Sequence, residues 1–195
     1  DTVHELQRVC EAESLDIEYR RADLLSIARG EAQLPIMRAS YDAYQALGLD
    51  EHNQLIDAAA ITERVRVAHA LAAILTPDAA MIHPAKLVRG LADSVEKHGG
   101  VIFERTPVRR VERGARPALI SENGRVLARR AVVVAGEAYL SGLPGFRNDV
   151  IPMSSMIILT EPLPQKVWDE IGWEGGEGLA SQIASVDYLT KTRDG

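Results

Sequence analysis

Side chains that could do chemistry by themselves are sparse in this chain. Cys10 is the only cysteine, so neither an internal disulfide nor a thiolate metal site can form. The five histidines are scattered, and no two of them form an HExxH or comparable ligand pair. No Ser/His/Asp or Cys/His constellation is evident either. We therefore predict no metal centre and no nucleophilic triad, and we assign His83, directly before Pro84, to the start of a helix.

The densest glycine cluster is Gly175-Gly176-Glu177-Gly178. A phosphate-binding G-x-G-x-x-G fingerprint follows an apolar strand and opens a helix, whose N-terminus receives the pyrophosphate. No apolar strand precedes this cluster, and the fingerprint is absent from the sequence. We interpret the cluster as a loop in which the glycines supply turn freedom.

Composition narrows the class of protein. The 195 residues are 46% hydrophobic and 26% charged with a net charge of −6, which is typical of a soluble globular chain. The acidic balance and the aromatic share of 5% argue against a nucleic-acid partner. No apolar stretch approaches the ~20 residues of a membrane span. A lone cysteine favours a reducing, cytoplasmic setting.

Periodic apolar residues predict the helices that position any site. Pro35 lies in the first turn of the second helix, where a missing N–H costs little. Pro84 opens the third helix, which carries an apolar stripe and is closed by Gly99-Gly100. The stripe consists of Leu87, Val88, Leu91, Ala92 and Val95. The predicted helices are 3–14, 31–47, 84–98 and 165–171.

Extended segments alternate with these helices and predict an α+β fold. The run Ala131–Ala135 is continuously apolar, as in a strand buried on both faces. Asn123-Gly124 predicts a tight hairpin. Residues 50–65 read as a polar connection with one short helix. The predicted strands are 17–28, 66–76, 101–104, 107–112, 118–121, 126–128, 131–135, 150–160 and 183–190. The segments 15–76 and 150–192 suggest one antiparallel sheet with helices. Residues 84–145 suggest a second architecture, in which a helix is followed by a buried strand and a β-meander.

An ordered set of short motifs carries a family resemblance. The motifs are Ile82-His83-Pro84-Ala85-Lys86-Leu87, Gly99-Gly100-Val101-Ile102-Phe103-Glu104-Arg105-Thr106-Pro107-Val108, Asn123-Gly124-Arg125-Val126, Val132-Val133-Val134-Ala135-Gly136-Glu137-Ala138-Tyr139, Thr160-Glu161-Pro162-Leu163 and Tyr188-Leu189-Thr190-Lys191-Thr192-Arg193-Asp194-Gly195. Together they resemble the middle of the D-amino-acid-oxidase-like family of FAD-dependent oxidoreductases. The resemblance covers about residues 60–195.

The resemblance implies a cofactor, a reaction and a division into domains. The parent protein would oxidise a C–N bond of a small amine or amino acid by hydride transfer to FAD. Residues 1–76 and 146–195 would be substrate-domain segments, with their sheet forming an antiparallel substrate-domain layer. Residues 77–145 would be an incomplete FAD-binding, Rossmann-like portion with the β-meander.

The resemblance also implies site residues. Val108 would contact the adenine through its main chain, and Ala135 and Gly136 would let backbone approach the ADP moiety. Tyr188 would orient the amine or the carboxylate of the substrate. Met153 and Met156 could line an apolar wall, or they could fill the core. The catalytic residues stay unidentified.

Parts of the family pattern are missing from this sequence. The dinucleotide fingerprint would precede it, and a second glycine-rich stretch and the carboxylate-binding arginine would follow Gly195. We therefore expect an interior fragment that does not hold FAD tightly and that either forms a homodimer through exposed strand edges or is only marginally stable. Two alternatives stay open: a non-catalytic α+β module that binds a ligand or partner, and one subunit of a heteromeric flavoenzyme.

Overall fold

The computed structural model describes residues 2–182 and 187–195. The chain divides into two compact units. Unit 1 comprises Asp1–Gly99 and Thr160–Gly195, and unit 2 comprises Gly100–Leu159. Helices occur together with antiparallel and mixed sheets, which confirms the predicted α+β class.

The helices of unit 1 follow the predicted apolar periodicities closely. Pro35 lies in the first turn of its helix, as expected. Gly172 adopts φ 63° and ends the last helix as a left-handed cap, a conformation that glycine adopts without strain. The helices are α1 (Thr2–Glu13), α2 (Leu34–Ala46), α3 (Ala58–Thr62), α4 (Pro84–Lys97) and α5 (Gln165–Ile171), with the short 3-10 turns η1 (Glu31–Gln33) and η2 (Asp50–His52).

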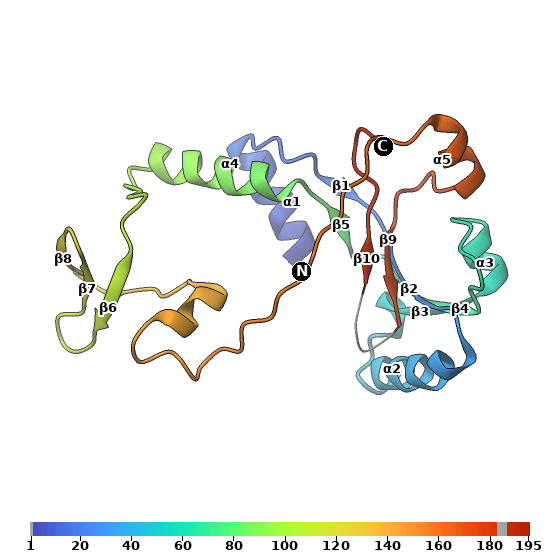
Figure 1. The fold of residues 1–195 in the computed structure, drawn as a ribbon, viewed down its shortest axis with the longest axis horizontal. Coiled ribbons are helices and arrows are strands. Elements are labelled where there is room, and N and C mark those ends of the chain that lie inside the picture. Colours follow the sequence, from blue (N-terminus) through green and yellow to red (C-terminus); the bar gives the residue numbers. More distant parts are fainter. Residues whose placement is uncertain (1, 183–186) are drawn as a thin grey trace. The chain divides into compact units, whose positions relative to one another are not determined.

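A five-stranded sheet forms the centre of unit 1 (Figure 1). Its strands, in spatial order, are β10 (Tyr188–Leu189), β9 (Gly178–Ser181), β2 (Leu24–Ala28), β4 (Ala72–Thr76) and β3 (Gln54–Asp57). Only β2 and β9 run parallel, and the other neighbours are antiparallel. A separate two-stranded ribbon pairs β1 (Arg20–Arg21) with β5 (Ala80–Met81).

Apolar side chains cover both faces of this sheet to different extents. On one face Leu25 and Leu75 pack with Ile61, Val65 and Trp173, which come from α3 and the segments next to α3 and α5. On the other face, α2 covers a smaller patch, where Met37 packs against Ala28 and Ile74. The first face is therefore closed by the core, and the second face is closed only beneath α2.

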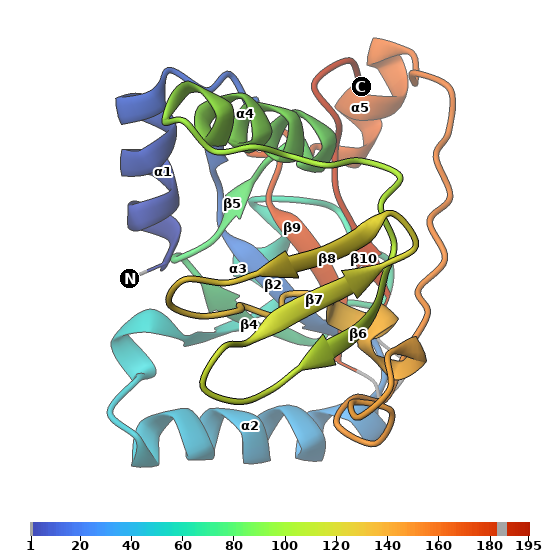
Figure 2. The same ribbon diagram turned by 90° about the vertical axis from the view of Figure 1, so that its left-hand side faces the viewer.

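Unit 2 is built around a three-stranded antiparallel meander, seen flat in Figure 2. Its strands are β6 (Val108–Glu112), β7 (Ala118–Ser121) and β8 (Gly124–Leu127), and the 3-10 segment η3 (Glu137–Gly142) follows them. Gly124 adopts φ 140° in the β7–β8 hairpin, which confirms the turn predicted from Asn123-Gly124.

Three predicted strands are wrong as strands. Residues 101–104, 131–135 and 150–160 form no ladder, and the latter two stretches have no regular structure at all. A strand exists only where a neighbour accepts its backbone hydrogen bonds, and these stretches have no such neighbour among the described residues. Although these segments are rich in residues that favour strands, their backbones therefore remain unpaired within the described residues.

Other elements differ in extent. Residues 50–65 contain the strand β3 as well as a short helix, and β4 occupies only the second half of the predicted 66–76. The strand β9 was not predicted, because it begins at Gly178, the last residue of the glycine cluster. Of the predicted last strand, Tyr188–Leu189 pairs with β9, while 183–186 lie outside the described residues.

The apolar stripe of α4 is largely exposed, although a helix of a folded domain normally buries such a stripe. Val88 is 67% exposed and Val95 48%, and no residue of α4 is fully buried. The predicted helix is correct, but the described residues do not cover this face.

Candidate functional site

Tyr188 lies at the edge of the five-stranded sheet and is 71% exposed. The strand register pairs Tyr188 with Ala180 and Ala180 with Ser26. Residues that pair directly across neighbouring strands point to the same face of a sheet. These three side chains therefore share one face, opposite the core around Leu25. We call this the Tyr188 face.

The next register row of the Tyr188 face contains Gly178, Leu24 and Thr76. The side chains of Ser26, Leu24 and Thr76 are half-buried, so α2 does not close this part of the face. Among the described residues, no hydrogen bond involves the hydroxyl of Ser26 or that of Tyr188. Both hydroxyls thus lack a partner within the described residues, whereas Ala180, which lies between them in the register, is buried.

The glycine loop before β9 encloses an arginine instead of a phosphate. The Arg20 guanidinium donates to the carbonyl oxygens of Gly175 and Gly176, at 2.7 and 2.9 Å. A phosphate cradle presents N–H groups to its ligand, whereas this loop presents carbonyl oxygens. Gly176 has φ +60°, and a Cβ there would collide with the Arg20 side chain. The interpretation of the cluster as a structural loop is supported.

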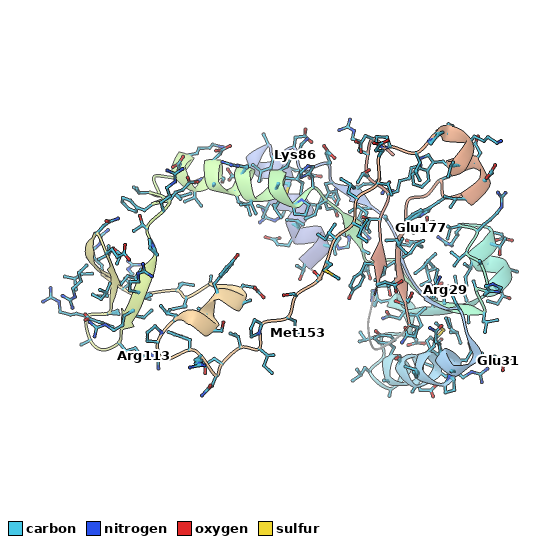
Figure 3. The ribbon with its side chains drawn as sticks, in the orientation of Figure 1. Arg29, Glu31, Lys86, Arg113, Met153 and Glu177 are labelled. Atoms are coloured by element: carbon cyan, nitrogen blue, oxygen red, sulfur yellow. The ribbon has the colours of Figure 1, made fainter. Side chains whose placement is uncertain are left out.

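A charged network fixes the same loop, and Figure 3 marks Glu177 within it. Arg64 donates to Asp23 at 2.7 Å and lies 3.6 Å from Glu177 Oε1. The Glu177 side chain is 7% exposed, and its Oε2 has no hydrogen-bond partner. Arg64 is therefore the cation that balances a buried carboxylate at the entrance to β9.

The residues expected near the nucleotide all lie in unit 2. Val108 begins β6, pairs with Ser121 next to a bulge, and is 39% exposed. Ala135 is exposed, and Gly136 is the residue before η3. A Cβ on Gly136 would lie 2.9 Å from Leu140 Cδ2. Local packing against η3 therefore gives Gly136 its own reason to lack a side chain.

Other stretches of unit 2 also expose apolar side chains. Val133 is 87% exposed, and Ile157 and Ile158 are 90% and 92% exposed. Met153, marked in Figure 3, and Met156 are 88% and 95% exposed. Neither methionine fills a core within the described residues. Within the described chain, no backbone hydrogen bond involves residues 131–135 or 150–159.

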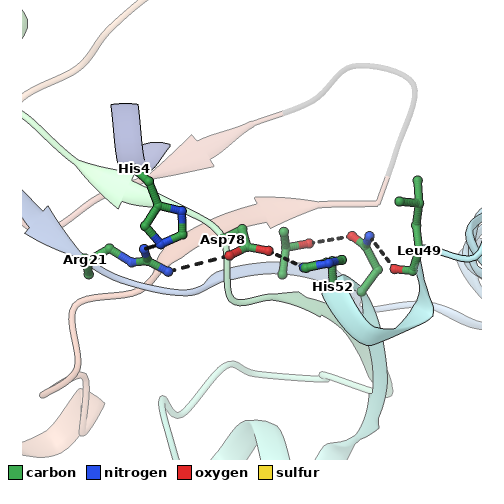
Figure 4. A network of polar contacts seen from close by, with 7 residues as sticks. His4, Arg21, Leu49, His52 and Asp78 are labelled. Atoms are coloured by element: carbon green, nitrogen blue, oxygen red, sulfur yellow. Dashed lines mark hydrogen bonds and ion pairs between the residues drawn. The ribbon is translucent and has the colours of Figure 1, made fainter. Parts of the chain in front are cut away.

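Polar contacts hold the periphery of unit 1 in place (Figure 4). Asp78 accepts from His52 Nδ1 at 2.5 Å and lies 3.5 Å from Arg21. His4 Nε2 lies 2.6 Å from Arg21 Nη1. These contacts connect α1, β1, the turn after β4 and η2. His83 caps α4, where its Nδ1 accepts from the backbone N–H of Lys86, so its predicted role at a helix start is confirmed.

Glu13 joins α1 to α4. It accepts from Ser94 Oγ at 2.9 Å, and Lys97 Nζ lies 3.3 Å away. The hydrogen bond from Ser94 and the nearby Lys97 lower the pKa of Glu13 below its ordinary value. In the same way, Lys86 lowers the pKa of Glu18. Both carboxylates are therefore stabilised in the ionised form by the α4 side chains.

In the part of the chain that the structure covers, no three His, Cys, Asp or Glu residues are grouped as a metal site. No helix within residues 2–182 and 187–195 has both the length and the apolar character that a membrane crossing requires.

Solved structures share this fold. The L-proline dehydrogenase from P. horikoshii matches 99% of this chain with a TM-score of 0.71 and 15% identity, over 51% of its own chain. The glycine oxidase from Geobacillus kaustophilus matches 98% of this chain with a TM-score of 0.68 and 17% identity, over 55% of its own chain. The chain therefore shares its fold with these two enzymes over almost its whole length.

The family model described as FAD dependent oxidoreductase, DAO, matches residues 1–195, and the chain belongs to this family. The resemblance found in the sequence is thus confirmed. Gamma-glutamylputrescine oxidoreductase of Escherichia coli K12 is 28% identical over 77% of this chain and 35% of its own length. The probable oxidoreductase OrdL of Haemophilus influenzae is 26% identical over 100% of this chain and 48% of its own length. The chain thus spans between a third and half of these curated relatives.

Several residues of this region gave no signal in the sequence. Ser26 was not singled out, because the parallel pairing of β2 with β9 that aligns it with Ala180 is non-local. Arg20 and Arg64 were not singled out, and Glu177 was named only as a member of the glycine cluster. A buried carboxylate can be recognised only once its tertiary partner is known.

Proposed function

We propose that the protein containing this chain oxidises a C–N bond of a small amine or amino acid. The observation that carries the proposal is the Tyr188 face, with two hydroxyls that make no hydrogen bond within the described residues, in a chain that matches an FAD-dependent oxidoreductase family throughout. The relatives with printed activities act on amine or amino-acid compounds according to their names. The same sheet face can orient an amine, because a hydroxyl oxygen accepts from the amine N–H and a hydroxyl O–H donates to the amine nitrogen.

The family is FAD-dependent, and bound FAD would supply the acceptor for the hydride that leaves the carbon bearing the amine. Val108 fits an adenine contact, because it lies partly exposed beside a bulge that interrupts strand pairing. Ala135 and Gly136 fit an approach to the ADP moiety, because the run before them has unpaired backbone groups. Tyr188 would hold the substrate by its hydroxyl. No residue of this chain is assigned to proton or hydride transfer.

The domain assignment follows from the same proposal. Residues 77–145 would complete an FAD-binding domain with a dinucleotide-binding unit from outside this sequence, and residues 1–76 and 146–195 would form substrate-domain segments. The apolar run 131–135 and the exposed stripe of α4 support this, since both lack a covering element within the described residues. The lone, buried Cys10 fits a reducing compartment, and we propose the cytoplasm.

A measurement of flavin binding tests this domain assignment. By equilibrium titration, this chain alone should bind FAD only weakly, because the pyrophosphate seat is not in its sequence. Dissociation constants of micromolar or below would refute that part of the proposal. Light scattering of the isolated chain should show self-association through the unpaired apolar segments, and a stable monomer would argue against it.

Flavin reduction tests the activity itself. When the flavin-loaded full-length protein is mixed anaerobically with an amine or amino-acid substrate, the visible absorbance of its flavin should fall as the flavin is reduced. The product should be an imine or the carbonyl compound formed by its hydrolysis. A protein whose flavin is reduced by dithionite but by no amine or amino acid would overturn the proposed function. If FAD binds only after a second, different chain is added, the protein is one subunit of a heteromeric flavoenzyme.

A further inference from the structure

We propose that one end of the meander in unit 2, which is rich in arginine, is an interaction surface for a second copy of this protein. The surface that it receives is an acidic corner on unit 1 of that copy. The inference concerns assembly, so it goes beyond the proposed reaction and does not depend on it. Two observations carry it: a group of arginines without carboxylate partners and a group of carboxylates without cation partners, both within the described residues.

Unit 2 is basic, although the whole chain is acidic. It contains nine arginines, no lysine and five acidic residues, and thus has a net charge of +4. Three of the arginines are balanced locally. Glu112 accepts from Arg110 at 2.8 Å and from Arg125 at 2.9 Å, and Glu122 accepts from Arg109. These contacts occupy two of the five carboxylates of the unit.

Four further arginines lie at one end of the meander. Two belong to the loop 113–117 between β6 and β7, and two belong to the chain 128–130 that leaves β8. The two segments are adjacent, because the carbonyl oxygen of Pro117 accepts from the N–H of Ala128 at 2.9 Å. These four residues are Arg113, Arg116, Arg129 and Arg130.

A fifth arginine belongs to the same group. The guanidinium of Arg113, marked in Figure 3, lies 5.3 Å from the centre of the Phe146 ring, which brings the chain around Arg147 to this loop. We call the five residues the arginine end. All five are exposed, and none of them forms an ion pair within the described residues.

Unit 1 carries the complementary charge. It contains 23 acidic and 13 basic residues, a net charge of −10. Between Arg38 and Arg64 the chain has five acidic residues and neither lysine nor arginine. The segment Leu47–Glu51, between α2 and β3, lies in the middle of this stretch, and all five of its residues are exposed. We call this segment the acid corner.

The acid corner combines free carboxylates with apolar surface. The side chains of Asp50 and Glu51 form no ion pair within the described residues. Leu47 is 73% exposed and Leu49 is 40% exposed. Two adjacent carboxylates beside two exposed leucines are suited to a protein interface, which combines apolar area with specific charge pairs.

The arginine end fits such a surface better than it fits a phosphate polymer or a membrane. Arginine binds a carboxylate with two parallel N–H donors, and protein interfaces are enriched in arginine and aromatic residues and depleted of lysine. Phe146 and Leu127, which is 46% exposed at the end of β8, supply apolar area near the guanidiniums. An extended polyanion would also be repelled by the net charge of unit 1, whereas a small acidic corner meets only the arginines.

The mass of the flavin-loaded full-length protein in solution tests the inference. Sedimentation is measured over a series of protein concentrations at low and at high salt. We expect assemblies of more than one copy at low salt, with an association constant that falls at least about tenfold as salt shortens the Debye length from ~30 to ~3 Å. Association through exposed apolar chain would not weaken in this way, because salt screens charges and not apolar contacts.

Charge reversal identifies the two surfaces. Arg113→Glu with Arg116→Glu should weaken association at low salt at least about tenfold, because like charges would then face each other across the contact. Asp50→Arg with Glu51→Arg should have the same effect from the other side. A protein with all four changes has opposite charges in contact again, and it should associate at least about threefold more tightly than either pair of changes alone.

Two further variants serve as controls. Arg89→Glu with Lys166→Glu gives the same change of net charge at exposed cations of unit 1, which lie outside both surfaces and form no ion pair within the described residues. It should lower the association constant by less than about threefold. Arg113→Gln with Arg116→Gln removes the charges without reversal and should weaken association about three- to tenfold at an unchanged melting temperature.

The results that would overturn the inference are specific. A single copy at every protein concentration and salt level would do so, as would equal losses in the arginine variants and in the control. A protein with all four changes that associates no better than the separate pairs would rule out the acid corner as the partner. A full-length protein that stays a single copy, but binds RNA or vesicles of anionic lipid through these arginines, would show that the partner carries phosphate.

Discussion

Replacing Arg64 by Met should destabilise unit 1 by leaving Glu177 buried without its cation. Arg64 is 36% exposed, so its ion pair with Asp23 at 2.7 Å contributes only about 1 kcal/mol. The larger cost comes from Glu177, whose side chain is 7% exposed and whose Oε2 has no partner. Leaving such a group unpaired costs about 1–3 kcal/mol. We therefore expect Arg64→Met to lower the free energy of unfolding by about 2–4 kcal/mol.

A double-mutant cycle isolates the buried carboxylate. If Glu177 causes the loss, Arg64→Met combined with Glu177→Gln should be more stable than the sum of the single changes by about 0.5–3 kcal/mol. Asp23→Asn measures the share of the other ion pair. Urea unfolding is followed by tryptophan fluorescence, since Trp173 is buried in the same core cluster as Val65. A cost for Arg64→Met below about 0.5 kcal/mol, or strictly additive changes, would refute the reasoning.

Two further results are expected. Tyr188→Phe in the full-length protein should lower kcat/KM about 10- to 100-fold, with little change in stability because the side chain is 71% exposed. The matched control is Leu189→Phe, at a side chain that points to the other face, and it should change kcat/KM by less than about twofold. Equal losses of kcat/KM in the two variants would count against a role of Tyr188 in substrate binding. The lowered pKa of Glu13 means that its contacts with Ser94 and Lys97 stabilise the fold above its ordinary value of 4.5 and are lost as the pH falls below it. The melting temperature of Glu13→Gln should thus depend less on pH in the acid range, and an unchanged acid profile would contradict this.

Local sequence was sufficient for the helices. The stripe of α2, the Pro84 start of α4 and the seven residues of α5 are each specified by periodicity and by end signals within the element. The hairpin at Gly124 was equally predictable, because two adjacent residues determine its turn. These features need no information from distant parts of the chain.

The site could not be predicted to the same extent, because its geometry depends on non-local pairing. Ser26 and Ala180 become neighbours only through the parallel contact of β2 with β9. The strand β9 itself is four residues long and begins with glycine, which weakens any strand signal. Arg64 and Glu177 meet across the fold for the same reason.

The failed and successful strand predictions differ in their neighbours, not in their sequences. Leu24–Ala28 is an apolar run, and it forms a strand because β4 and β9 lie on its two sides. Ala131–Ala135 is at least as rich in β-branched residues, yet Val133 is 87% exposed and its backbone is unpaired. A segment of this type gains stability only when both its backbone groups and its apolar side chains find partners. The residue types of Ala131–Ala135 favour an interior strand, but the described residues supply neither a partner strand nor a covering surface for it.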